Sequence, residues 1–167
     1  MSRRSFITTL LTAFTLTVMV FLYTLHFRYC SGSYTLMKLR LSMSENNVTA
    51  VEKLCNLKSF SDSFMLMLPL IESQQFVPTD SVFTNRLIRL HAENRPLDFI
   101  YAVSGLLLQT GGSMVNQHEK TSGKGKILTQ YYKLKGRDYS IGISFYFERN
   151  ESELQLQCIE KLFVTPI

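Results

Sequence analysis

The side chains in this sequence that could do redox chemistry are three cysteines, Cys30, Cys55 and Cys158. Cys55 falls on the apolar face of a predicted helix and Cys158 on that of a predicted last strand, so both point into one core. A disulfide between them is geometrically plausible, and closing a loop of about 100 residues would stabilise the fold by roughly 4–5 kcal/mol. The alternative is two buried free thiols. We expect the disulfide if the compartment is oxidising, whereas Cys30 either links to a partner or stays a free thiol.

Acid–base and metal chemistry have few candidates. The histidines, His26, His91 and His118, are scattered, and none pairs with a cysteine at metal-ligand spacing. The motifs of zinc proteases, serine hydrolases and phosphate-binding loops do not occur. We therefore expect no enzyme, no metal and no cofactor. His91 and His118 are candidates for sensing acidity, because histidine titrates near neutral pH; the alternative for His91 is a histidine whose hydrogen bonds are satisfied within a sheet.

The elements that would position these residues follow from periodicity. Apolar side chains at 37, 39, 41 and 43 alternate with Lys38, Arg40 and Ser42, which predicts a half-buried strand over 37–43. Helices are predicted after the capping residues at 44–47 and, rich in Leu and Met, over 62–74. The second half favours β-structure, with strands at 82–92, 99–108, 127–135, 139–147 and 154–158 and a long polar loop at 110–126. The prediction is one α+β domain over 31–167, with early helices and a late antiparallel sheet.

Apolar residues concentrate at the front of the chain. The sequence is 46% hydrophobic with a net charge of +5, and no charged residue lies between Arg4 and Arg28. At about 1.5 Å per residue this segment would cross a hydrocarbon core of about 30 Å. Bulky residues at its end argue against a cleaved signal peptide. We therefore predict a cytoplasmic stub at 1–5, a transmembrane anchor at 6–27 and an exported domain, which excludes a cytosolic enzyme, a multi-pass transporter and a disordered chain.

The charge does not indicate a nucleic-acid-binding protein. Arg3, Arg4 and Arg28 give residues 1–30 a charge of +3, so residues 31–167 carry only +2. The sequence pI of about 9.2 thus reflects the flanks of the apolar segment rather than a basic domain.

Three threonines lie along one face of the apolar segment. Thr8, Thr12 and Thr15 are spaced i, i+4, i+7, and small polar residues allow two helices to approach closely. They predict contact with a helix of a partner. The alternative is that each hydroxyl only bonds a carbonyl of its own helix.

A stub with the sequence Met1-Ser2-Arg3-Arg4, one apolar span and a domain of about 140 residues without catalytic motifs resembles a group of bacterial inner-membrane proteins. These are the ToxS, TcpH and PsaF/MyfF companions of membrane-bound winged-helix transcription activators. The sequence is most similar to the PsaF/MyfF type, which has two periplasmic cysteines where this chain has Cys55 and Cys158.

The resemblance implies a single-pass protein of the bacterial inner membrane with its C-terminal domain in the periplasm. It would bind and stabilise the periplasmic domain of a ToxR-like activator without touching nucleic acid itself. Virulence or fimbrial genes would then respond to signals such as pH or temperature. An alternative class is a bitopic structural or assembly component of an envelope or secretion machine, or a type II membrane glycoprotein.

Overall fold

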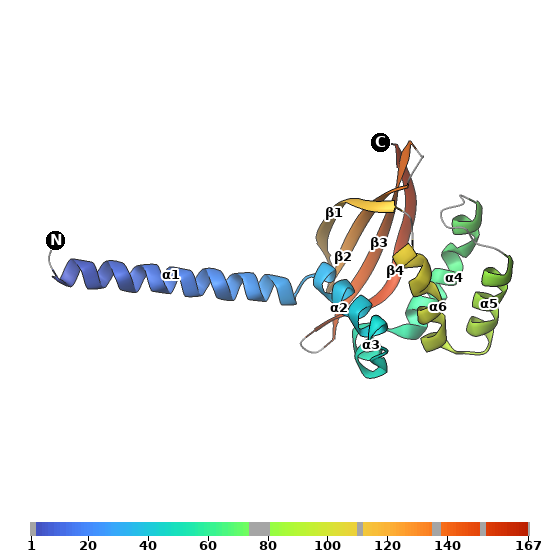
Figure 1. Ribbon diagram of the computed structural model, residues 1–167, viewed down its shortest axis with the longest axis horizontal. Helices are drawn as coiled ribbons and strands as arrows, with labels where there is room; N and C mark the ends of the chain where they lie inside the picture. The colour runs from blue at the N-terminus through green and yellow to red at the C-terminus, as the bar shows by residue number, and fades with distance from the viewer. Residues whose placement is uncertain (1–2, 74–80, 110–111, 135–137, 151–152, 167) are drawn as a thin grey trace.

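The computed structural model describes residues 3–73, 81–109, 112–134, 138–150 and 153–166, in which helices precede strands (Figure 1). The helices are α1 (Arg3–Tyr29), α2 (Gly32–Ser44), α3 (Val48–Leu54), α4 (Leu57–Ser73), α5 (Ser81–Ala92) and α6 (Pro96–Gln109). The strands are β1 (Gly112–Ser122), β2 (Gly125–Leu134), β3 (Tyr139–Asn150) and β4 (Glu153–Pro166). Each strand pairs antiparallel with the next, in the order β1-β2-β3-β4.

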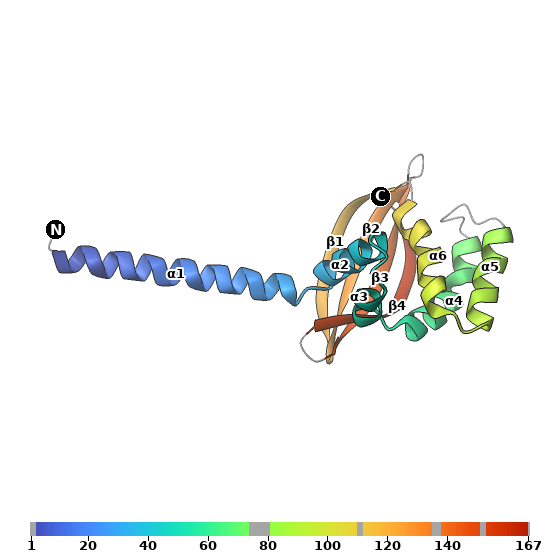
Figure 2. The ribbon, with the colours of Figure 1, turned by 60° about the horizontal axis from the view of Figure 1, so that its bottom comes forward.

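The helices other than α1 cover one side of the sheet unevenly. Figures 1 and 2 show α1 projecting away from the domain, while α2 crosses the sheet and α4 to α6 gather at its β4 end. α4 packs mainly on β4, and α2 reaches both β2 and β4. The β1 end of the sheet is therefore the part least covered by helices.

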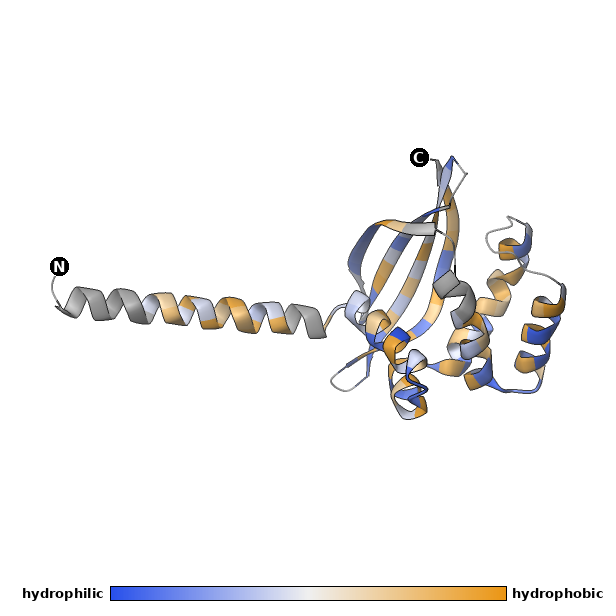
Figure 3. Ribbon diagram, viewed as in Figure 1, coloured by the Kyte–Doolittle hydropathy of each residue, from blue (hydrophilic) through white to orange (hydrophobic). Residues whose placement is uncertain are grey.

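The core lies between the helices and one face of β2, β3 and β4. Phe145 and Phe147 of β3 and Leu156 of β4 are each at most 1% exposed. They join one apolar cluster with Phe60 of α4 and Ile100 of α6. Figure 3 shows the matching alternation of hydrophobic and hydrophilic residues along the strands. Truncating a buried phenylalanine such as Phe145 to alanine typically costs about 3–5 kcal/mol of stability. The packing of these side chains against α4 and α6 therefore contributes strongly to holding the sheet in position.

The predicted strand at 37–43 is wrong, because these residues belong to α2. Ser31 caps this helix by accepting a hydrogen bond from the Tyr34 amide at 3.1 Å. Leu36, Leu39 and Met43 are its buried apolar side chains, which is helical spacing. The alternation seen in the sequence included Met37 and Leu41, which are both exposed.

The predicted strands at 82–92 and 99–108 are also helices, α5 and α6. α6 begins at Pro96 with Asp98 in its first turn, a combination that favours a helix start because proline needs no amide partner there and the carboxylate complements the helix dipole. Leu87 and Leu90 are the buried residues of α5, one turn apart. Tertiary packing of these amphipathic faces outweighs the strand preference of their aromatic and β-branched residues.

The predicted loop at 110–126 is largely β1 and the hairpin turn after it. Gly123 has a φ of 57° and is the first of two residues between the paired Ser122 and Gly125. This is where a type II′ hairpin turn requires glycine. The hairpin predicted from 127–135 and 139–147 and the strand from residue 154 are found as β2, β3 and β4.

The predicted transmembrane anchor at 6–27 lies within α1. α1 is 27 residues long, but among the described residues no helix combines the length and the apolar character needed to cross a bilayer. Threonines recur along α1, and it is on average less apolar than α6. The finding contradicts the transmembrane part of the predicted fold and the single-pass, inner-membrane location with a periplasmic domain that rested on it.

The predicted disulfide is absent, because Cys55 and Cys158 are both free. Phe147 pairs with Leu156 whereas Tyr146 pairs with Cys158, so Gln157 is an extra residue in β4. A bulge of this kind reverses which face the following side chains take. Cys158 therefore shares the face of half-buried Tyr146, while Cys55 is 1% exposed in the core.

The two thiols should differ in reactivity. Burial raises the pKa of the Cys55 thiol, and burial together with the nearby Glu160 raises that of Cys158. Without reductant, alkylation of the native protein should modify Cys158 and leave Cys55 unmodified until denaturant is added. Because its pKa is raised, the rate of Cys158 alkylation should keep rising above a pH of about 8.5, the ordinary pKa of a thiol. Peptide mass spectrometry measures both, and recovery of a peptide pair linked through Cys55 and Cys158 would contradict the structure.

Candidate functional site

The β4 edge of the sheet is covered by the chain itself. Cys55 forms a parallel bridge with Leu156, and the Asn56 amide donates to the Leu156 carbonyl at 2.8 Å. Further along, the Ile159 amide donates to Ser63 Oγ at 3.1 Å. The segment joining α3 to α4 and the first turns of α4 thus occupy backbone groups that an edge strand would otherwise leave unpaired.

The β1 edge has no such cover, since β2 is the one strand paired with β1 in the described part of the chain. The hairpin register tells which backbone groups face outward. A two-residue turn is closed by a hydrogen-bonded pair, here Ser122 and Gly125, and such pairs alternate along an antiparallel ladder. The backbone groups of Gln117, Glu119 and Thr121 therefore point away from β2, toward the open edge.

One contact supports this register directly. The Gln117 amide donates to Asn116 Oδ1 at 2.8 Å. This bond forms because the Gln117 amide is not directed at β2. The register shifts between Met114 and Asn116, where Val115 is the extra residue. Beyond this bulge, the edge from Gln117 to Thr121 is regular.

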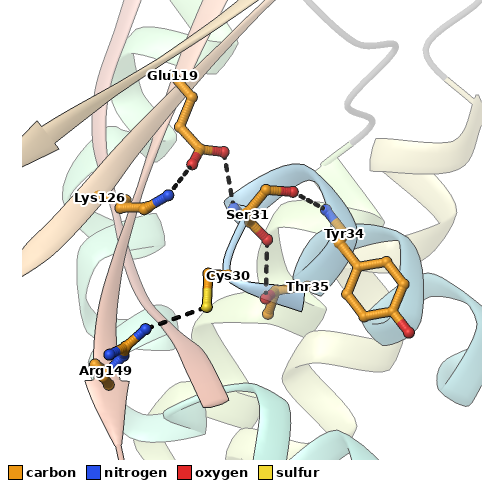
Figure 4. A network of polar contacts seen from close by, with 8 residues as sticks. Cys30, Ser31, Tyr34, Thr35, Glu119, Lys126 and Arg149 are labelled. Atoms are coloured by element: carbon orange, nitrogen blue, oxygen red, sulfur yellow. Dashed lines mark hydrogen bonds and ion pairs between the residues drawn. The ribbon is translucent and has the colours of Figure 1, made fainter. Parts of the chain in front are cut away.

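β1 is held against the start of α2 by a carboxylate. Glu119 Oε2 accepts from the Gly32 amide at 2.8 Å, and Glu119 Oε1 lies 2.8 Å from Lys126 Nζ (Figure 4). The Gly32 amide belongs to the first turn of α2, where a carboxylate is favoured because the unpaired amides and the helix dipole are positive. Both side chains are only about a quarter exposed or less, so solvent screens this pair less than a surface ion pair.

A second set of side-chain hydrogen bonds joins β1 and β2 to α2. Gln130 donates to Gln117 Oε1 at 3.2 Å and accepts from the Tyr132 hydroxyl at 2.7 Å. The Tyr132 hydroxyl in turn accepts from Arg40 of α2 at 3.2 Å. Gln130 is 3% and Tyr132 7% exposed, so these bonds satisfy groups that would be costly to leave unpaired. The hairpin β1–β2 is thereby fixed relative to α2.

A groove of about 360 Å³ lies where β1 meets the start of α2. We call it the edge groove. Its lining comes from three elements, namely Ser31 and Ser33 at the start of α2, 117–121 of β1, and Lys126 and Leu128 of β2. Much of the surface that lines the groove is apolar, but Ser31, Ser33 and Gln117 bring hydroxyl and amide groups to it, which can donate hydrogen bonds to a polar side chain.

The histidines predicted to sense acidity lie in different places. His91 is on α5, with Nε2 at 2.8 Å from Asp62 Oδ1 of α4 and its ring edge-on to Phe99. Both side chains are over a third exposed, so solvent screens this contact. His118 is exposed on β1 and lines the edge groove.

The other predicted site residues are spread over the molecule. Thr12 and Thr15 are exposed on α1, and Thr8 lies outside the described side chains. Further along α1, the hydroxyl of Thr17, which is not one of the three predicted threonines, donates to the Ala13 carbonyl at 2.8 Å. Cys30 accepts from Arg149 at 3.2 Å at the junction of α1 and α2 (Figure 4). No cluster of metal-ligating side chains occurs among the described residues.

The roles of Glu119 and Lys126 do not follow from the sequence, which predicts a loop over 110–126. From Asn116 to Ser122, β1 is polar on both faces, so this part of the strand gives no alternation to detect. The sequence does contain one usable indication, the pattern Ser122-Gly123-Lys124-Gly125, in which a serine–glycine turn precedes an evident strand.

Comparison with known proteins yields no match. The chain is not matched by any family model, and neither a curated protein nor a solved structure resembles it at a significant level.

Replacing the carboxylate should loosen β1. Glu119→Gln removes the ion pair with Lys126 and the charge at the start of α2, and we expect a loss of about 1 kcal/mol in the free energy of unfolding. Urea denaturation measures it, with Glu52→Gln on the exposed surface of α3 as the matched control. Equal stability of the two variants would mean that the carboxylate does not hold β1 to α2.

Proposed function

We propose that this protein is an accessory regulator that binds a partner protein by accepting a strand of the partner at the open β1 edge. The observation that supports this most is the asymmetry of the sheet. The chain covers the β4 edge with Cys55, Asn56 and Ser63 but leaves the groups of Gln117, Glu119 and Thr121 directed outward. Strand addition to such an edge is a recurring mode of protein recognition.

The β1 edge has two features that limit unspecific pairing with other strands. It also has a regular segment that is available to pair with a partner strand. A bulge and a lysine are common protections of edge strands, and β1 has both, in Val115 and Lys120. The regular segment from Gln117 to Thr121 is prepared for pairing by the bonds that hold Glu119 and Gln117 to α2 and β2. A preorganised edge loses less conformational entropy when a partner binds.

The partner we propose is a ToxR-like winged-helix transcription activator, in keeping with the resemblance to the PsaF/MyfF companions. The accessory chain would stabilise a marginally stable domain of the activator by mass action, and this contributes about 2.7 kcal/mol when the binder is present at a hundredfold excess over Kd. Virulence or fimbrial genes would then respond to pH or temperature through the abundance of the activator.

α1 offers a second contact in this proposal. Thr12 and Thr15 lie on its surface together with large exposed apolar side chains, of which Phe14 is 71% and Met19 68% exposed. Exposed apolar area of this kind marks interaction surfaces. The threonine face predicted from Thr8, Thr12 and Thr15 is accordingly proposed to meet a helix of the same partner.

A proline at the edge tests the proposal. Thr121→Pro removes an outward amide without breaking the β1–β2 ladder, whereas Thr121→Val keeps the amide and changes only the side chain. Affinity purification of the tagged chain from its host should recover a winged-helix protein at least about tenfold better with Thr121→Val than with Thr121→Pro. Quantitative mass spectrometry measures this ratio, and thermal melts of both variants check that they fold.

Two results would contradict the proposal. One is that wild-type protein enriches no winged-helix protein over an untagged control. The other is that Thr121→Pro enriches it as well as Thr121→Val does, which would place the contact away from β1.

A further inference from the structure

The charge around the open edge is one-sided. Residues 112–134, which form the hairpin of β1 and β2, contain four lysines and a single acid, Glu119. Glu119 is already engaged by Lys126 and by the Gly32 amide. Lys120 and Lys124 are exposed, and neither takes part in an ion pair among the described residues. The turn end of the edge therefore presents positive charge.

The opposite end of the same strand is apolar. Met114 is 49% and Val115 53% exposed, at the bulge that precedes the regular segment. Along the length of β1 the edge thus changes from apolar at Met114 and Val115 to basic at Lys120 and Lys124. A binding segment that complements it must change from apolar to acidic over the same distance.

The edge groove adds a place for one side chain of that segment. A strand paired with β1 directs alternate side chains to the face that carries Gln117 and Glu119. On that face the groove is lined by Ser31, Ser33 and Gln117, which offer hydroxyl and amide donors. An acidic side chain there would receive hydrogen bonds and would lie near Lys126.

We infer that the β1 edge recognises an extended partner segment that runs antiparallel to β1, with acidic residues first and apolar residues later in its sequence. This rests on the proposed function, because it assumes that β1 accepts a strand. The antiparallel direction follows from the greater stability of antiparallel pairing. The acidic residues lie beside Lys120 and Lys124, and the apolar residues cover Met114 and Val115.

Two peptides of identical composition test the inference with the full chain. One is a short threonine-based peptide with aspartates in its first half and valines in its second half, and the other has the same residues in reversed order. Both carry the same charge, so non-specific attraction affects them equally. Fluorescence anisotropy should give a Kd about tenfold lower for the first peptide. Lys124→Glu should weaken its binding by about tenfold, while Lys133→Glu, the same charge change at the other end of the hairpin, should weaken it much less.

The outcomes separate this inference from the function on which it rests. Equal binding of the two peptides, tighter binding of the reversed peptide, or equal effects of the two lysine variants would each overturn the acidic-first segment. If Thr121→Pro still abolished binding in those cases, strand addition at β1 would stand. Failure of both peptides to bind overturns the inference as well, whereas the proposed partner is judged separately by its recovery from the host.

Discussion

A sheet in which each strand pairs only with its neighbours along the chain has two edges, and this protein covers one of them. The Asn56 amide and Ser63 hydroxyl bond the outer side of β4, and α4 packs along it. The β1 edge receives no equivalent element within the described residues. An edge that retains unpaired backbone groups is a site for another strand, so the functional proposals follow from this one constraint.

The open edge is held in place rather than left loose. Glu119 links β1 to the first turn of α2. A separate chain of hydrogen bonds joins Gln117 of β1 through Gln130 and Tyr132 to Arg40 of α2. A carboxylate near a helix start and a fully bonded buried network each contribute modestly. Their combined effect is positional, because they set the register and orientation in which β1 meets another chain.

The sequence predicted the β-structure that has strong alternation and failed where alternation was misleading. Phe145 and Phe147 alternate with polar residues and identified β3. In α2, Met37 and Leu41 complete an alternation of apolar and polar residues that is typical of a strand, although both side chains are exposed on the helix. β1 was missed because from Asn116 to Ser122 its two faces are both polar, and the bond that fixes it joins residues 32 and 119. The disulfide was mispredicted because one extra residue, Gln157, turns Cys158 to the other face, and a bulge leaves no mark in composition.

Hydrogen exchange of individual β1 amides tests the central claim most directly. In the free protein, the amides of His118, Lys120 and Ser122 should exchange slowly because they bond β2, whereas those of Glu119 and Thr121 should exchange rapidly. When the protein that co-purifies with the chain is added back, NMR should show Glu119 and Thr121 becoming protected. Unchanged exchange at these two amides in a formed complex would contradict strand addition at β1.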